Sequence, residues 1–195
     1  VLPLIGSKEG IMHISMAYLN EGDQVLVPNP GYPAYEATAK IAGAEVQYYD
    51  LTDANGWLPD LEAIAANNDL TKVKIMWLNY PHMPTGTMAT VEMFQHLIVF
   101  AKKHNILLCH DNPYFFILNE KPISILQFDG AKEVALELIS LSKCYNMAGW
   151  RIGAVHGKKE FLDPIITFKS NMDSGMFRPL QEAAIVALGL GKEWT

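Results

Sequence analysis

The chain has 195 residues, of which 50% are hydrophobic and 10% are aromatic. That length and apolar content suffice for a compact domain with a substantial core. Fifteen basic against 21 acidic residues give a formal net charge of −6, and no basic run stands out. The charge pattern therefore argues against a nucleic-acid partner.

Two lone cysteines, Cys109 and Cys144, favour a reducing compartment over a disulfide scaffold. No apolar stretch approaches the roughly 20 residues that a membrane-spanning helix needs. The N-terminus carries no basic leader, and the histidines lack further ligands at metal spacing. We therefore expect a cytoplasmic protein without a membrane partner or a metal site.

Short β-rich runs alternate with helical patterns along the chain. The runs span residues 1–5, 23–28, 44–49, 73–80, 105–111, 136–142 and 151–157. Helical patterns open at Ile11, cover 33–41, 58–67 and 158–171, and are clearest from Thr90, where apolar residues recur every three to four positions. Several runs are apolar nearly throughout, as in strands covered on both faces. The alternation predicts an α/β sandwich with a mainly parallel sheet.

Polar and aromatic residues gather where these predicted strands end. In such folds, ligands bind beyond the carboxyl ends of the strands, near the switch in strand order. The segments at those positions are 6–8, 29–32, 80–86, 111–114 and 140–143. This arrangement is what an active site on a rigid scaffold requires.

The segment SLSKCYNMAGWRIG, residues 140–153, places Lys143 directly after an apolar run and Arg151 eight positions later. A lysine amine is nucleophilic when neutral, and burial or a nearby cation favours that state. Lys143 is thus a Schiff-base lysine or a snorkelling lysine at a strand end. Arg151 could clamp a phosphate with help from the hydroxyls of Ser140 and Ser142, or all three could be ordinary surface residues.

Three further segments carry equally open alternatives. GSKEG, residues 6–10, opens a helix pattern whose N–H groups favour an anion, although Gly-Ser is also common in plain turns. Asp111 ends a predicted strand, where a carboxylate can hold a ring nitrogen protonated or cap a turn. Tyr32 and Tyr35 lie in a proline-fixed turn and could stack on a planar ring or fill the core.

Together and in this order, the segments resemble the large domain of fold-type I pyridoxal-phosphate (PLP) enzymes, the class I/II aminotransferases of the aspartate and LL-diaminopimelate type. SLSKCYNMAGWRIG is similar to the family's lysine segment, DNPYFFI to its Asp-x-x-Tyr strand end, NPGYPAY to its stacking-tyrosine turn, YPHMPTG to its Asn-Pro-Thr-Gly loop, and GSKEGI to its phosphate-binding helix start. The match reaches from the first residues to at least Gly157. It implies a three-layer α/β/α sandwich with a seven-stranded sheet, formed by a PLP-binding large domain over residues 1–195.

The resemblance implies a role for each candidate residue. Lys143 would be the catalytic residue, which forms a Schiff base (aldimine) with PLP and then moves the proton from Cα of the amino acid. Asp111 would keep the ring nitrogen protonated, Tyr114 would hydrogen-bond the phenolic oxygen, and Tyr32 would stack on the ring. The phosphate would be held by the remaining candidates, namely Ser7, Lys8, Ser140, Ser142 and Arg151.

One position departs from the family pattern. The loop asparagine that donates to the phenolic oxygen is Met83 here, and methionine cannot donate. Unless His82 or Asn79 replaces it, Tyr114 would hold that oxygen alone. We therefore expect a more electron-rich oxygen and a raised Schiff-base pKa.

The resemblance also implies a function: a PLP-dependent aminotransferase that moves an amino group between an α-amino acid and a 2-oxo acid, and that forms a homodimer. The family's N-terminal arm and C-terminal small domain are missing from residues 1–195, so we expect a segment of a longer protein that is inactive alone. Arg178 lies in the wrong part of the chain to be the family's carboxylate-binding arginine. Two alternatives share the same residues: another fold-type I enzyme, such as a carbon–sulfur lyase, and the ligand-sensing domain of a transcription regulator.

Overall fold

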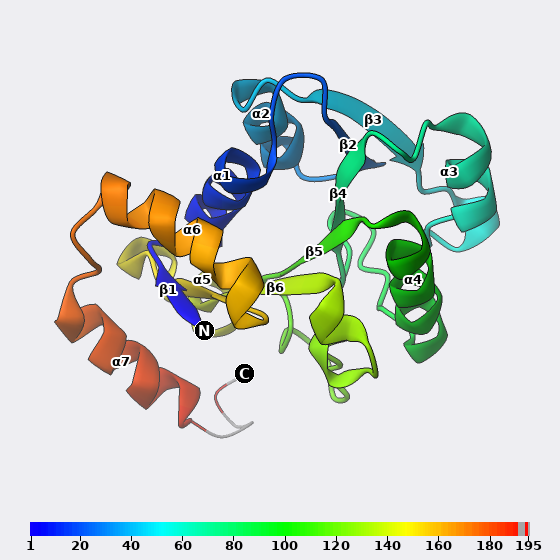
Figure 1. Ribbon diagram of the computed structural model, residues 1–195. Helices are drawn as coiled ribbons and strands as arrows, with labels where there is room; N and C mark the ends of the chain where they lie inside the picture. The colour runs from blue at the N-terminus through cyan, green and yellow to red at the C-terminus, as the bar shows by residue number, and fades with distance from the viewer. Residues whose placement is uncertain (191–193, 195) are drawn as a thin grey trace.

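The computed structural model describes residues 1–190 and Trp194, which form a sheet with helices on both sides (Figure 1). The strands are β1 (Leu2–Leu4), β2 (Gln24–Asn29), β3 (Glu45–Asp50), β4 (Val73–Asn79), β5 (Leu107–Asn112), β6 (Ala135–Ser140) and β7 (Gly153–His156). The helices are α1 (Ser7–Tyr18), α2 (Pro33–Ile41), α3 (Leu61–Asn67), α4 (Val91–His104), α5 (Leu141–Cys144), α6 (Lys159–Met172) and α7 (Arg178–Leu188).

The sheet has seven strands in the order β1-β7-β6-β5-β4-β2-β3. β7 pairs antiparallel with β1 and β6, whereas all the other pairs are parallel. The predicted fold class is therefore confirmed. From β2 the chain adds β3 toward one edge and then crosses back to β4 and β5, so the direction of winding switches between β2 and β4. Ligands bind at the carboxyl side of such a switch.

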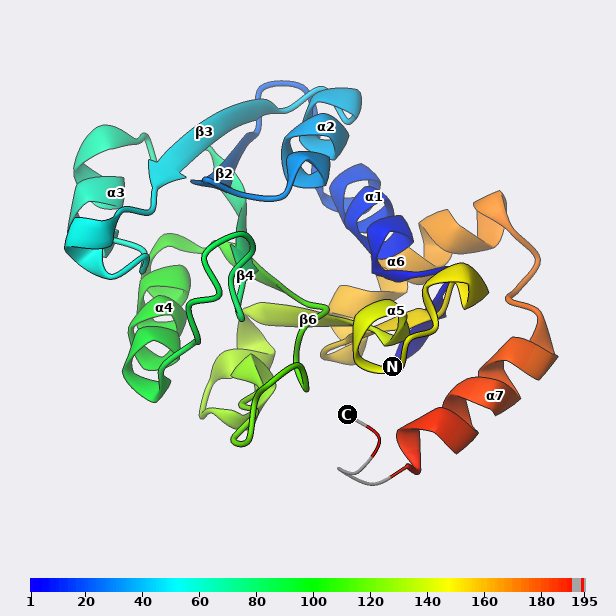
Figure 2. The ribbon, with the colours of Figure 1, turned by 180° about the vertical axis from the view of Figure 1, so that it is seen from behind.

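Helices cover both faces of the sheet (Figures 1 and 2). Val25, Ile75 and Trp77 belong to a buried cluster with side chains of α1, α2 and α6. Leu26 and Met76, their immediate neighbours in sequence, belong to a second cluster with side chains of α3 and α4. Successive residues of a strand face opposite sides, so a sheet covered on both faces requires apolar residues at nearly every position.

The strand predicted over 136–142 is too long, because β6 ends at Ser140. The Ser140 hydroxyl accepts a hydrogen bond from the Ser142 backbone N–H at 3.2 Å, which caps the short helix α5. Ser142 and Lys143 consequently lie on α5 and not on a strand. Lys143 is exposed there, so its ammonium group avoids the desolvation cost of a buried strand end.

Two helices also begin elsewhere than predicted. The helix expected from Ile11 begins at Ser7, because the positive φ of 76° at Gly6 already separates it from β1. The helix expected over 58–67 begins at Leu61, after Asp60 caps it by accepting from Ala63 N at 2.9 Å. The remaining strands agree with the prediction within two residues at each end.

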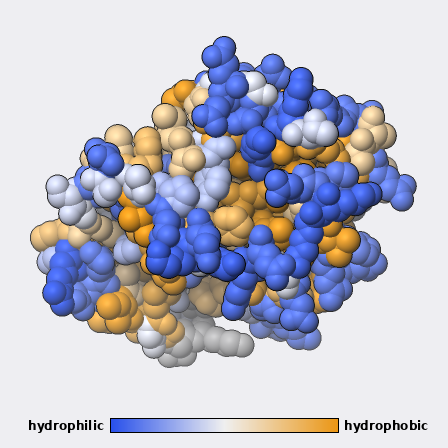
Figure 3. Space-filling view, in the orientation of Figure 1, coloured by the Kyte–Doolittle hydropathy of each residue, from blue (hydrophilic) through white to orange (hydrophobic). Residues whose placement is uncertain are grey.

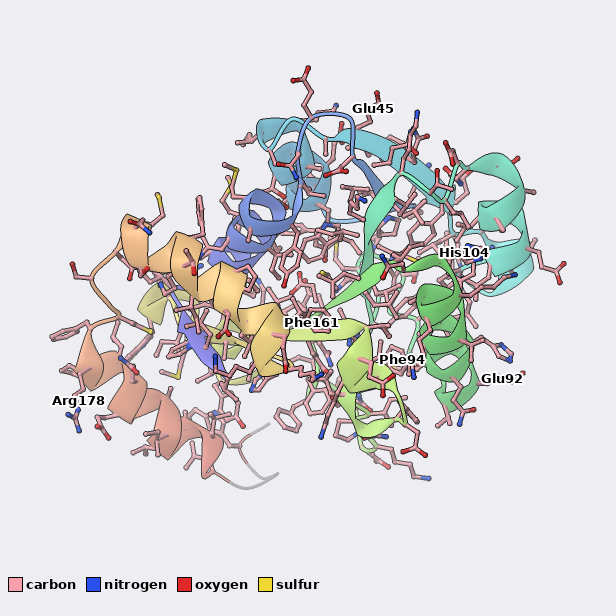
Figure 4. All side chains as sticks on the ribbon, in the orientation of Figure 1. Glu45, Glu92, Phe94, His104, Phe161 and Arg178 are labelled. Carbon is pink, nitrogen blue, oxygen red and sulfur yellow. The ribbon has the colours of Figure 1, made fainter. Side chains whose placement is uncertain are left out.

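Side chains sort by face along the outer helices. Figure 4 shows Phe94 on the inner side of α4 and Glu92 pointing away from the body, and Phe94 is fully buried. The space-filling view shows polar side chains over much of the visible surface, with apolar side chains between them (Figure 3). Among the described residues, no helix combines the length and the apolar character needed to cross a membrane.

Candidate active site

A cavity of about 430 Å³ opens where β4, β5 and β6 end and where α1 and α2 begin. All nine residues predicted to bind the cofactor line it: Ser7, Lys8, Tyr32, Asp111, Tyr114, Ser140, Ser142, Lys143 and Arg151. Five further residues complete the lining: Tyr35, Asn79, Met83, Pro113 and Ala148. The fold thus brings together candidates that lie up to 144 positions apart in the sequence.

Asp111 lies at the end of β5 and is only 3% exposed. Its Oδ2 accepts a hydrogen bond from the Tyr35 hydroxyl at 2.9 Å, while Oδ1 is buried without a partner in the described part of the chain. Burial raises the pKa of Asp111 to about 6, against the opposing effect of the Tyr35 hydrogen bond. A buried carboxylate with one free oxygen is matched by a cationic N–H group inside the cavity.

Tyr35 has a role that sequence reasoning missed. Its ring is fully buried and stacks on Trp77, with ring centroids 4.9 Å apart and planes 8° apart. The Tyr35 hydroxyl therefore fixes the orientation of the Asp111 carboxylate through its hydrogen bond. Because the ring itself is buried against Trp77, the alternative that Tyr35 stacks on a ligand ring is wrong. Its partner Asp111 lies 76 positions away, a separation that no local pattern encodes.

Tyr32 is the tyrosine of this turn that presents its side chain to the cavity. It is half-buried and packs edge-on against Tyr35, with centroids 5.7 Å apart. The Lys8 Nζ atom lies 5.3 Å from the centroid of the Tyr32 ring, a cation–π distance. An aromatic face fixed by Tyr35 on one side is suited to hold a planar ligand ring.

One end of the cavity is suited to an anion. We call the five polar residues there the phosphate end: Ser7, Lys8, Ser140, Ser142 and Arg151. Helix α1 begins without a side-chain cap, so its first N–H groups are available to a ligand. Arg151 donates from Nη1 to the Ala148 carbonyl at 2.8 Å and to Ser142 Oγ at 3.3 Å.

Gly6 makes this arrangement possible. A Cβ atom at that position would lie 2.3 Å from Nη2 of Arg151, and the φ of 76° also disfavours an L side chain. The guanidinium group thus packs directly against the backbone that precedes α1. This contact joins the start of the chain to the segment before β7.

Lys143 and Tyr114 face the cavity from α5 and from the segment after β5. Lys143 is exposed, and Tyr114 is half-buried. Burial raises the pKa of Tyr114, and the nearby Asp111 and Tyr32 add to the rise. At neutral pH the Tyr114 hydroxyl is therefore protonated and can donate a hydrogen bond.

The hydrogen bonds around Met83 indicate whether His82 or Asn79 could donate to a ligand in place of the family's loop asparagine. Both ring nitrogens of His82 point elsewhere, Nδ1 to Thr85 Oγ1 at 2.8 Å and Nε2 to the Pro30 carbonyl at 3.1 Å. Asn79 lines the cavity, and its amide donates one hydrogen bond to the Asp111 carbonyl at 2.8 Å. His82 is thus excluded as a donor, whereas Asn79 keeps a second amide hydrogen.

Cys144 is unsuited to nucleophilic chemistry despite its place beside Lys143. Its thiol donates to the Pro113 carbonyl at 3.3 Å, and burial raises its pKa. Arg178 points away from the body (Figure 4), pairs with Glu182 at 3.1 Å and does not line the cavity. Within residues 1–190 and Trp194, no group of three or more His, Cys, Asp or Glu side chains could hold a metal ion.

The chain belongs to the class I and II aminotransferase family, because the family model described as "Aminotransferase class I and II" matches residues 1–192. The resemblance inferred from the sequence is thereby confirmed. Members of this family typically use PLP.

Individual members of known function or structure are similar to nearly the whole of this chain. The chain is 50% identical over 195 residues to an LL-diaminopimelate aminotransferase of Dehalococcoides mccartyi, and the match covers 99% of this chain and 50% of that protein. An apo structure of BacF from Bacillus subtilis superposes with a TM-score of 0.93 at 41% identity, over 98% of this chain and 49% of that one. The structure of aspartate aminotransferase from Thermus thermophilus with maleate superposes with a TM-score of 0.89 at 27% identity, over 96% of this chain and 48% of that one. The chain thus spans about half the length of the relatives that it matches.

Proposed function

We propose that the full-length protein containing this chain is a PLP-dependent aminotransferase. It transfers the amino group of an LL-diaminopimelate-type amino acid to a 2-oxo acid. The strongest support is the buried Oδ1 of Asp111, which has no hydrogen-bond partner among the described residues, on a side chain that lines the same cavity as Lys143. A protonated ring nitrogen is the kind of group that this oxygen lacks. The names and 50% identity of the relatives support the substrate class.

The residues present fit PLP as a ligand. Asp111 would hold the ring nitrogen in its protonated form, Tyr32 would cover one ring face, and Tyr114 would donate to the phenolic oxygen. The phosphate end offers helix N–H groups, hydroxyls and the two cations Lys8 and Arg151, which together match a dianion.

Lys143 would carry the chemistry of both binding and proton transfer. When bound, PLP supplies an electron sink for the pair of electrons left at the amino acid Cα. The Lys143 amine would hold the cofactor through its carbonyl group and would serve as the general base for the Cα proton of the amino acid.

The homodimer and the cytoplasmic location expected from the resemblance stay predictions. The large domain predicted over 1–195 has the same standing, and residues 191–193 and 195 of it lie outside the described residues. Gel filtration with light scattering on the full-length protein measures its oligomeric state.

A labelling experiment on the full-length protein tests the proposed function. PLP is added, the mixture is reduced with borohydride, and the modified peptide is mapped by mass spectrometry. We expect label on Lys143 and transamination between LL-diaminopimelate and 2-oxoglutarate. Replacing Lys143 by alanine should remove the label and lower turnover by about 100- to 10,000-fold.

Lys159→Ala is the matched control, because Lys159 is exposed on α6 and pairs with Asp163. This variant should retain both label and turnover. Label spread over several lysines would contradict the proposed function. Release of a keto acid without any 2-oxo acid acceptor would instead indicate a lyase.

A further inference from the structure

A second charged cluster lies outside the cavity, between the first turn of α1 and the end of α6. Lys169, in the last turn of α6, is only 6% exposed. Its Nζ atom lies 2.9 Å from Oε1 of Glu9 and 2.5 Å from Oδ2 of Asp173. A buried lysine with two carboxylate partners is a paired charge, and removing the lysine leaves its partners uncompensated.

Glu9 connects this cluster to the phosphate end. It lies two positions after Ser7, and its second oxygen, Oε2, accepts from the Ile5 backbone N–H at 2.6 Å. Glu9 thus braces the turn that leads from Ile5 into α1. The same carboxylate places a negative charge within one turn of the N–H groups offered to the phosphate.

The other members of the cluster keep Lys169 charged. Burial alone lowers the pKa of Lys169, but hydrogen bonds with Asp173 and Glu9 outweigh it and raise the pKa above its ordinary value. Asp173 is fixed in turn by the Gly175 N–H, which donates to Oδ1 at 2.9 Å. Nε2 of His13 lies 3.9 Å from Oε1 of Glu9. Burial lowers the pKa of His13, so the imidazole adds no charge at neutral pH.

We propose that Lys169 is a positioning residue of the phosphate end: it neutralises Glu9, so that the carboxylate can brace the start of α1 without repelling the cofactor phosphate. The inference rests on the proposed function and extends it to a residue outside the cavity. The physical basis is that a helix N-terminus attracts negative groups, and an unpaired carboxylate in the first turn repels a phosphate bound at the same N-terminus.

The experiment compares PLP with pyridoxal, which has the same ring and aldehyde but no phosphate. Dissociation constants for both are measured on the full-length protein and on Lys169→Met, by the visible absorption of the bound ligand. We expect Lys169→Met to bind PLP about tenfold more weakly and pyridoxal unchanged. A merely structural defect would weaken both ligands alike.

The double variant Glu9→Gln/Lys169→Met tests the charge directly. The introduced amide keeps an oxygen for the Ile5 N–H and removes the uncompensated charge at position 9, the one beside the phosphate end. The ratio of the PLP and pyridoxal dissociation constants should therefore return to within about twofold of wild type. Lys169→Arg should also retain the ratio. If Lys169→Met does not fold, the ratio of the double variant still tests the proposal.

Two results would overturn the inference. One is an unchanged ratio in Lys169→Met, and the other is a double variant that binds PLP as weakly as the single one. Failure of the proposed function is recognised separately, because wild type would then lack label on Lys143. Lys159→Met, which breaks the exposed pair with Asp163 on the same helix, should leave the ratio unchanged.

Discussion

Asp111 holds a carboxylate where water has little access, at the base of the cavity. Its folded-state pKa of about 6 lies above the ordinary value of 3.8, because burial disfavours the charged form. Between those two pH values the folded protein binds more protons than the unfolded chain. The stability of the cofactor-free protein therefore falls as pH rises through this range, by about 3 kcal/mol over the complete titration from well below pH 4 to well above pH 6.

Asp111→Asn removes this pH dependence. In urea titrations of the cofactor-free protein at pH 4 and pH 7, wild type should lose about 2 kcal/mol relative to the variant. The slope with pH is the quantity to compare, because the new amide donor has its own desolvation cost. A variant that loses stability with pH as steeply as wild type would show that another group is responsible.

Met83 lines the same cavity and, under the proposed function, would leave the phenolic oxygen of PLP without a donor from this position. An asparagine there could donate to the phenolic oxygen and withdraw electron density, so Met83→Asn should lower the pH midpoint of the visible band of the PLP-loaded protein. Met83→Leu is the matched control, because leucine also lacks a donor. Equal midpoints in wild type and Met83→Asn would contradict the prediction that the missing donor raises the Schiff-base pKa.

At the scale of elements, the start of α1 and the segment before β7 form one unit around Gly6. Gly6→Ala places a Cβ atom against the Arg151 guanidinium at a positive φ. We expect a loss of about 1–3 kcal/mol in the free energy of unfolding, together with weaker PLP binding. Urea titration and visible absorption measure the two effects separately.

Gly22→Ala separates backbone strain from the displacement of Arg151. Gly22 has a similar φ of 87°, but a Cβ atom there meets nothing within 4 Å. The control should lose stability and retain PLP affinity. If both variants bind PLP as wild type does, Arg151 is not needed in its observed position.

The sequence predicted elements better than their ends. β-rich runs identified all seven strands, and several of those runs are apolar nearly throughout because helices cover both faces of the sheet. The end of β6 was missed because the capping by Ser140 depends on a side-chain rotamer, which the hydrophobic pattern does not contain. Without that cap, Ser142 and Lys143 look like a continuation of the strand.

At the scale of the whole molecule, the sequence indicated which residues line the site but not what supports them. The lining residues follow strand ends, a place that local patterns identify. Their supports depend on long-range contacts: Tyr35 reaches Asp111 across 76 positions, and Lys169 reaches Glu9 across 160. The strand order and the antiparallel direction of β7 were equally hidden, since both follow from packing of the complete chain.

The pairing of β1 with β7 can form only late in translation, because the two strands lie near opposite ends of the segment that builds the sheet. Leu2 pairs with Val155. If elongation adds ~5–20 residues per second, the ribosome synthesises Val155 roughly 8–30 s after Leu2, and β1 has no partner strand until then. Ser7 lies shortly after β1 in the sequence, and Arg151 lies shortly before β7. The two sides of the phosphate end therefore meet only when β7 has left the ribosome. A nascent chain shorter than this lacks the complete cavity, so under the proposed function PLP would bind only in the last stage of translation or later.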